Sequence, residues 1–192
     1  MHEVTFSGLS LDASPGLVMT PRPATEQLVA AAADFVGSGP ARVVDVGTGS
    51  GAVAVAIAQA APLAHVYATD TSPHAVELAD ANVQRHALGD RVTVRRGDLL
   101  DPVPGPIDLV VANLPYLPAG EASLYPDLAG EPVSAVFAPG DGLDPYRRLL
   151  AACAERLDDG GAVIIQLHRQ VLAATITELP TLQASLDYAL AA

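Results

Sequence analysis

The stretch that decides the fold reads Asp45-Val46-Gly47-Thr48-Gly49-Ser50-Gly51, and it joins two apolar runs of different character. Residues 42–46 are rich in valine, which predicts a short strand, whereas residues 52–60 are rich in alanine, which predicts a helix. Glycine has no Cβ, so the turn between them can be tight and its backbone can approach a ligand closely. We therefore expect a strand, a glycine-rich turn and a helix in immediate succession.

Strands and helices alternate outward from this turn. Further strands are predicted at residues 65–69, 91–95, 107–112 and 162–167. Helices are predicted at residues 73–89, with Ser72 as the cap, and at residues 145–157. A last helix near residues 170–179 and a last strand near residues 183–189 complete the pattern.

The residues before the glycine-rich turn are predicted to form one or two short strands and a loop, at residues 1–23, and then a helix capped by Thr25. Alternation at this short spacing implies right-handed crossovers. The fold class is therefore α/β, with a mostly parallel, doubly wound sheet covered by helices on both faces. Near the C-terminus the sequence predicts only one last strand, at residues 183–189, so the C-terminal strand pair is expected to be incomplete.

Composition and charge narrow the class of protein. Half of the 192 residues are hydrophobic, which suits one packed domain, and the formal net charge is −12. Lysine and arginine together number ten, so free nucleic acid is not expected as the main partner, because phosphate binding depends on these residues. Neither a signal-peptide pattern nor an apolar run of about 20 residues is present, so we expect a cytoplasmic protein without a membrane span.

The one cysteine, Cys153, permits no internal disulfide, which fits a reducing compartment. Its apolar neighbours predict a small buried residue on a helix. No cluster of cysteine and histidine accompanies it, so no metal site is expected.

Polar and glycine residues follow the predicted strands at the points where they end. The glycine-rich turn, Asp70, Asp98 and Asn113 each follow a different strand. Ligands in such sheets bind beyond the carboxyl ends of the strands, so these residues are expected to face one crevice.

The glycine-rich turn favours one of two cofactor classes. A dinucleotide fingerprint spaces its glycines G-x-G-x-x-G and places pyrophosphate at the helix N-terminus. Here the spacing is G-x-G-x-G, and the Asp45 carboxylate, two residues before the first glycine, would repel pyrophosphate. A carboxylate at this position suits a positive sulfonium with a zwitterionic amino-acid tail, so S-adenosylmethionine is favoured. The expected contacts in the turn are Asp45, Gly47, Thr48, Gly49, Ser50 and Gly51.

Two further acids are candidates for the cofactor's nucleoside. Asp70 can accept the ribose hydroxyl hydrogens, and its alternative role is a helix cap or a loop acid in solvent. Asp98 can accept from the adenine amino group with Leu99 beside the ring. An ordinary turn in the Asp-x-x-Asp-Pro sequence is the alternative for Asp98.

The segment Asn113-Leu114-Pro115-Tyr116 carries the proposed acceptor chemistry. An amide or ring-bound amino nitrogen is a poor nucleophile because its lone pair is delocalised. Hydrogen bonds from its NH₂ group to the Asn113 side-chain oxygen and the Leu114 carbonyl would hold it in line with the methyl group. Tyr116 can stack on the flat group, and Asn113 also borders the cofactor. A plain Asn-x-Pro turn after a strand is the alternative.

These motifs together resemble the HemK/PrmC family of protein-glutamine methyltransferases. Residues 21–26 resemble its P-R-P-E-T-E, residues 45–51 its D-L-G-T-G-S-G, and residues 113–116 its N-P-P-Y. Glu131-Pro132, and then Asp141-Gly142-Leu143-Asp144 with Tyr146-Arg147, resemble its E-P and D-G-L-D-x-Y-R segments. The resemblance implies a seven-stranded Rossmann-like class I methyltransferase fold and S-adenosylmethionine as donor. It also implies a glutamine acceptor, best known in the Gly-Gly-Gln loop of peptide-chain release factors.

The sequence departs from the family at three points. Leu114 replaces the first proline of N-P-P-Y, and Gln166-Leu167-His168 stands where the family has E-I-G. His168 is a candidate polar group at a strand end, with a surface or pocket-wall histidine as the alternative. The family's N-terminal helical domain is absent from this sequence, so we expect an extension at residues 1–23 and the methyltransferase catalytic domain at residues 24–192.

The leading hypothesis is methyl transfer to a protein glutamine amide, with a release factor as the implied partner. A second hypothesis is methylation of an amino group on a nucleic-acid base or a small molecule. A third is a non-catalytic subunit that binds the cofactor and acts through a partner, which the departures at Leu114 and Gln166 leave open.

Overall fold

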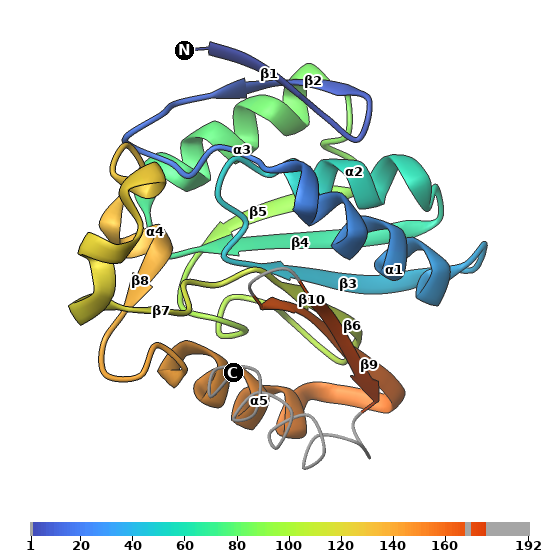
Figure 1. The fold of residues 1–192 in the computed structure, drawn as a ribbon. Coiled ribbons are helices and arrows are strands. Elements are labelled where there is room, and N and C mark those ends of the chain that lie inside the picture. Colours follow the sequence, from blue (N-terminus) through green and yellow to red (C-terminus); the bar gives the residue numbers. More distant parts are fainter. Residues whose placement is uncertain (1, 168–169, 176–192) are drawn as a thin grey trace.

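The computed structural model describes residues 2–167 and 170–175, and its centre is a six-stranded sheet. The strand order is β10-β9-β6-β3-β4-β5 (Figure 1). The strands are β3 (Ala41–Val46), β4 (Ala64–Asp70), β5 (Val92–Arg96), β6 (Ile107–Ala112), β9 (Leu157–Leu167) and β10 (Gln170–Thr175). All neighbours pair in parallel except β10, which is antiparallel to β9. The carboxyl ends of the five parallel strands therefore lie along one edge of the sheet.

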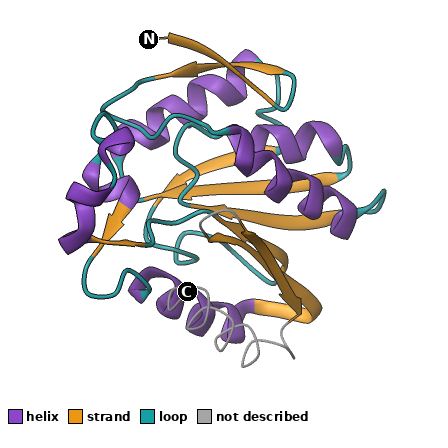
Figure 2. Ribbon diagram, in the orientation of Figure 1, coloured by secondary structure: helices purple, strands orange, loops and turns teal. Residues whose placement is uncertain are grey.

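Helices cover both faces of this sheet (Figure 2). One face carries α1 (Glu26–Val36), α2 (Ala52–Ala60) and α3 (Pro73–Arg85), and the other carries α5 (Asp144–Arg156). The hairpin of β1 (His2–Phe6) and β2 (Leu9–Ala13) lies against α3 (Figure 1). The expected α/β fold, with a doubly wound and mostly parallel sheet, is confirmed.

The core divides according to the alternation of side chains along the strands. Val43 and Leu109 pack with α1 and α2, whereas their neighbours Val44 and Val110 pack with α5 on the opposite face. Buried parallel strands need apolar residues at successive positions because both faces are covered. This requirement explains the continuous apolar run that predicted β6.

The predicted elements agree with the structure most closely near the glycine-rich turn. The helix at residues 52–60 and the strand at residues 107–112 match α2 and β6 to the residue. Ser72 caps α3 as expected, since its hydroxyl accepts from the Ala75 amide at 3.3 Å and Pro73 begins the helix. This helix ends at Arg85, earlier than predicted, and β9 begins at Leu157 rather than at residue 162.

Two local predictions are wrong. Residues 170–175 form the strand β10 instead of a helix, and Gln170 pairs with Leu167 of β9. The backbone of β9 offers unpaired groups at its free edge, and pairing there satisfies the returning chain. Thr25 caps no helix, because the 3₁₀ turn η1 (Pro23–Thr25) leads directly into α1 and leaves Thr25 in a helical conformation. The rest of the predicted last helix and the strand at residues 183–189 lie outside the described residues.

The long stretch between β6 and α5 folds into short elements. They are β7 (Leu117–Pro118), η2 (Ala119–Leu124), η3 (Pro126–Leu128), α4 (Val133–Val136) and β8 (Phe137–Ala138). β7 and β8 pair in parallel, which closes the stretch on itself near the carboxyl ends of the strands (Figure 1). No helix within the described residues has the length and apolar character needed to cross a membrane.

Candidate cofactor and acceptor site

A cavity of about 610 Å³ lies where the carboxyl ends of β3, β4 and β6 meet. This volume is in the range of small-molecule sites in proteins. Twelve of the thirteen residues expected at the site line the cavity, namely Asp45, Gly47, Thr48, Gly49, Ser50, Asp70, Asp98, Leu99, Asn113, Leu114, Pro115 and Tyr116. Gly51 is not in the lining. It begins α2 at a φ of 79°, where an added Cβ would lie 3.0 Å from the Cα of Ala79.

Two glycines of the turn adopt conformations that L side chains avoid. Gly47 has a φ of 71° and Gly49 a φ of 56°. A Cβ on Gly47 would also lie 2.6 Å from a methyl carbon of Leu114. The Gly47 and Thr48 amides donate to the Thr69 carbonyl at 2.9 and 3.0 Å, which ties the turn to β4. The glycine at position 47 is therefore required both by the turn and by the side chain facing it.

Asp45 lies at the base of the cavity with 2% of its surface exposed. One carboxyl oxygen accepts from the Thr48 hydroxyl at 2.6 Å and from the Ala54 amide at 3.2 Å. Burial raises the pKa of Asp45 to about 7, although both hydrogen bonds oppose this shift. The carboxyl group thus titrates near neutral pH, and a cationic ligand group would favour its ionised form.

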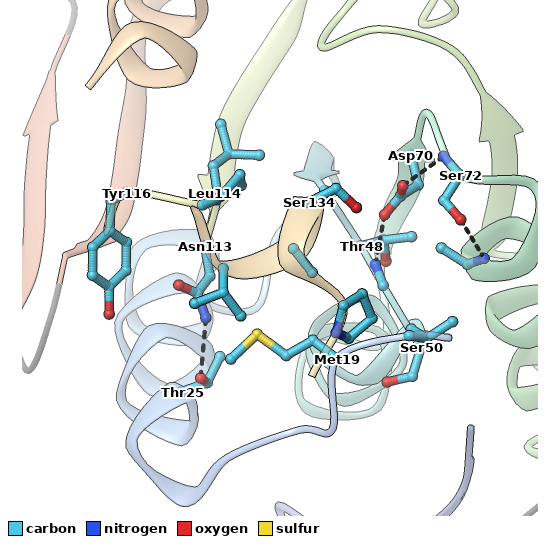
Figure 3. Close-up of a pocket in the computed structure, with 18 of the residues that line it drawn as sticks. Met19, Thr25, Thr48, Ser50, Asp70, Ser72, Asn113, Leu114, Tyr116 and Ser134 are labelled. Atoms are coloured by element: carbon cyan, nitrogen blue, oxygen red, sulfur yellow. Dashed lines mark hydrogen bonds between the residues drawn. The ribbon is translucent and has the colours of Figure 1, made fainter. Parts of the chain in front are cut away.

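Asp70 ends β4 and is held by two backbone amides. Its two oxygens accept from Gly49 at 3.0 Å and from Ser72 at 2.9 Å (Figure 3). An ionised carboxylate has about four acceptor positions, so lone pairs remain for a ligand. The loop-acid alternative and the ligand-binding role are therefore compatible, because the loop contacts fix the orientation of the carboxylate at the cavity.

Asp98 forms an ion pair with Arg148 of α5, and both residues line the cavity. Leu99 beside it has a φ of 47°, and its carbonyl accepts from the Thr69 hydroxyl at 2.9 Å. Sequence reasoning missed Arg148, because fifty positions separate the two partners and no local pattern links them.

Asn113 follows β6, and its side-chain nitrogen donates to the Thr25 hydroxyl at 3.3 Å (Figure 3). Thr25 is 7% exposed and lines the same cavity. The amide nitrogen is directed at Thr25 and the oxygen is turned away from it (Figure 3). The structure thus gives Thr25 a contact that its role as a predicted cap did not include.

The Leu114 peptide is held by the hydroxyl of Tyr146, a fully buried residue of α5. The Leu114 amide donates to this hydroxyl at 3.0 Å, and the hydroxyl lies 3.1 Å from the Leu114 carbonyl and 2.8 Å from the Gln166 carbonyl. Burial raises the pKa of Tyr146, which keeps the hydroxyl protonated. The hydroxyl has one hydrogen, which the Leu114 and Gln166 carbonyls share, so at least one lone pair of the Leu114 carbonyl remains for the acceptor.

Gly142 packs against the backbone of Tyr116, in the same segment at residues 113–116. Its φ is 86°, and an added Cβ would collide with the carbonyl oxygen of Tyr116. The nearby Asp141 carboxylate binds Arg147 at 2.7 Å, which holds its pKa at about 2. The segment resembling D-G-L-D-x-Y-R thus packs against the segment at residues 113–116.

Two other motif segments meet beside the cavity. Glu131 accepts from the Thr20 amide at 3.1 Å and forms an ion pair with Arg22 at 3.4 Å. Sequence reasoning identified both segments by resemblance but gave no sign that they touch.

Gln166 lines the cavity, and its buried side-chain oxygen has no hydrogen-bond partner within the described residues. His168 lies outside those residues. Cys153 is buried on α5 as predicted, and burial raises the pKa of its thiol to about 12. Across residues 2–167 and 170–175, no group of three or more potential metal ligands occurs.

A parallel sheet with a glycine-rich turn after β3 and an Asn-Leu-Pro-Tyr segment after β6 defines a class I methyltransferase fold. The chain belongs to the methyltransferase small domain family, which matches residues 24–125. It is a homologue of the HemK/PrmC proteins, being 44% identical over 163 residues to the release factor glutamine methyltransferase of Gloeobacter violaceus. That alignment covers 83% of this chain and 57% of the relative.

A second relative agrees with this placement, and a solved structure shares the fold. The ribosomal protein uL3 glutamine methyltransferase of Bradyrhizobium diazoefficiens is 41% identical over 145 residues, which cover 73% of this chain and 46% of the relative. The hMettl16 catalytic domain, solved in complex with the MAT2A 3′UTR hairpin 6, has a TM-score of 0.69 over 94% of this chain and 67% of its own. At 18% identity that likeness concerns the fold alone. The chain spans a little over half of the length of the first relatives it matches.

Membership of this family implies S-adenosylmethionine as cofactor. The charge around the cavity fits a cation better than a pyrophosphate. Both arginines in its lining are paired with acids, Arg22 with Glu131 and Arg148 with Asp98. The four aspartates in the lining are Asp45, Asp70, Asp98 and Asp127. Such a lining attracts a sulfonium and an ammonium group, and it repels the two charges of a dinucleotide pyrophosphate.

Proposed function

We propose that this chain transfers a methyl group from S-adenosylmethionine to the side-chain amide nitrogen of a glutamine in a protein. The observation that carries the proposal is that one cavity joins the glycine-rich turn and Asp70 to residues 113–116. The first set suits the amino-acid tail and the ribose of the cofactor, with Asp98 and Leu99 at the adenine. The second set suits a planar NH₂ group. Donor and acceptor would therefore meet within the same cavity.

The chain's own residues would act by holding the acceptor nitrogen. Bound S-adenosylmethionine supplies an electrophilic methyl group on its sulfonium. The Asn113 oxygen and the Leu114 carbonyl accept hydrogen bonds from the acceptor NH₂ group, which leaves its lone pair facing the donor. The acidity of the nitrogen rises once it carries the methyl group, so its proton leaves without a strong general base. Positioning of this kind supplies much of the rate in transfer reactions.

The acceptor we propose is a glutamine-bearing loop of a release factor or of a ribosomal protein. Supporting this choice, the names of the relatives specify glutamine methylation of release factors and of uL3. The net charge of −12 supports a protein over free nucleic acid. We place the catalytic domain at residues 24–192 and the extension at residues 1–23, of which residues 17–22 line the cavity. The reaction would take place in the cytoplasm, where a lone unpaired thiol is common.

A transfer assay with methyl-labelled S-adenosylmethionine tests this function against release factors, ribosomal proteins, small amides and adenine-containing oligonucleotides. We expect label in a protein acceptor, on a glutamine. Label in an oligonucleotide instead would identify a base amino group, and not a glutamine amide, as the methyl acceptor. No label in any acceptor, together with intact cofactor binding, would favour the non-catalytic subunit.

A further inference from the structure

Thr25 touches the one side chain on which the proposed acceptor chemistry depends. The two residues are 88 positions apart, and the hydrogen bond from the Asn113 nitrogen to the Thr25 hydroxyl measures 3.3 Å. Thr25 is held in place by its own backbone, because its amide donates to the Arg22 carbonyl at 2.9 Å within η1. The bond therefore links the end of β6 to a fixed point at the start of α1.

The hydroxyl of Thr25 does not make the hydrogen bond that a threonine at the start of a helix usually makes. A threonine before a helix normally accepts from a free amide of the first turn, and losing such a cap costs about 1 kcal/mol. Here no such bond forms, and the hydroxyl meets Asn113 instead. Both residues line the cavity, so the contact lies at the site and not in the core.

The chemistry of a side-chain amide explains why this contact matters. Its oxygen only accepts and its nitrogen only donates, and the two ends exchange by rotation of the terminal bond. The acceptor NH₂ group needs the oxygen of Asn113, so a rotated side chain would face it with a second donor. In the structure the nitrogen is occupied by Thr25 and the oxygen is turned away from it (Figure 3).

We propose that Thr25 is a positioning residue that fixes the Asn113 amide with its oxygen toward the acceptor. This inference rests on the proposed function, because it assigns the rate of methyl transfer partly to the orientation of Asn113. It also gives a physical reason for a threonine in the segment that resembles P-R-P-E-T-E.

The test compares Thr25→Val, which keeps the side-chain shape and removes the hydroxyl, with Thr25→Ser, which keeps the hydroxyl. We expect Thr25→Val to lower kcat about tenfold, the effect of one lost hydrogen bond, with little change in KM or in S-adenosylmethionine affinity. Thr25→Ser should recover most of the wild-type kcat. An equal loss in both variants, or a parallel loss of cofactor affinity, would show a packing effect and overturn the proposal.

A second readout does not depend on activity. The side-chain NH₂ signal of Asn113 in a ¹⁵N–¹H spectrum, assigned by its disappearance in Asn113→Ala, should move in Thr25→Val and stay near its wild-type position in Thr25→Ser. An unmoved signal in Thr25→Val would contradict the proposal. If the wild-type chain methylates no acceptor, the proposed function fails, and this spectrum still decides whether Thr25 orients Asn113.

Discussion

The hydroxyl of Tyr146 lies 3.0 Å from the amide nitrogen of Leu114 and 3.1 Å from its carbonyl oxygen. One buried side chain thus holds both polar groups of the residue that replaces a proline of the family segment. A proline at this position would have no amide hydrogen to donate, so the bond from residue 114 to Tyr146 depends on the leucine found here. It gives the loop a restraint that the proline ring would otherwise supply.

Replacing Tyr146 with phenylalanine should destabilise the fold by about 1–3 kcal/mol. The change keeps the ring in the core but leaves the buried amide of Leu114 without its partner. Urea unfolding measures the free energy of the variant. Tyr67→Phe is the matched control, because Tyr67 lies in β4 against the same core cluster, and its loss of a hydroxyl should cost less. An equal loss of unfolding free energy in the two variants would mean that the hydrogen bonds of the Tyr146 hydroxyl do not stabilise the fold.

Cofactor binding should depend on pH through Asp45, whose pKa is raised to about 7 by burial. Below this pKa the carboxyl group is neutral and attracts the cationic cofactor less. The affinity for S-adenosylmethionine should therefore fall by up to about tenfold per pH unit as the pH drops below 7. Calorimetry at several pH values measures this slope. A slope that Asp45→Asn leaves unchanged would assign the titration to another group.

The same pKa has a consequence for stability. The pKa of Asp45 is higher in the folded chain than its ordinary value of 3.8, so the folded state binds the proton more tightly. The favourable contribution of this group is present below pH 3.8 and is lost as the pH rises to about 7. Asp45→Asn should therefore make the ligand-free protein more stable above pH 7, while weakening cofactor binding. Asp80→Asn, an exposed change on α3, is the control and should alter neither.

Replacing Gly142 with alanine should disturb residues 113–116 directly. The new Cβ would meet the Tyr116 carbonyl oxygen, so the loop must shift. A shift of this kind is expected to lower kcat by about 100-fold, since displacement of a reacting group by about 1 Å has that effect. Gly140→Ala is the matched control. Its φ of 64° brings similar backbone strain, but its Cβ would have no neighbour within 4 Å. Similar kcat values in both variants would argue that strain alone acts.

Local sequence signals predicted the parts of the fold that depend on local chemistry. The glycine-rich turn and the apolar run of β6 are such signals, because turn conformation and burial on both faces restrict the residue types directly. β10 was not predictable in this way, since its pairing with β9 satisfies backbone groups and leaves little trace in side-chain periodicity.

The site residues also divide into those that local sequence signals predict and those that only long-range contacts bring together. Strand ends placed Asp45, Asp70 and Asn113 at one cavity, because the carboxyl ends of parallel strands share an edge. The partners of the site residues were missed, as with Thr25 beside Asn113 and Arg148 beside Asp98. Those pairs are far apart in the sequence and have no spacing rule, so only the folded chain brings them together.

The most direct test of the central claim is tandem mass spectrometry of a release factor incubated with S-adenosylmethionine and this chain. Wild-type protein should add one methyl group to the side-chain nitrogen of a glutamine. Asn113→Ala should add none while still binding the cofactor. A methyl group on another residue type, or full transfer by Asn113→Ala, would contradict the account.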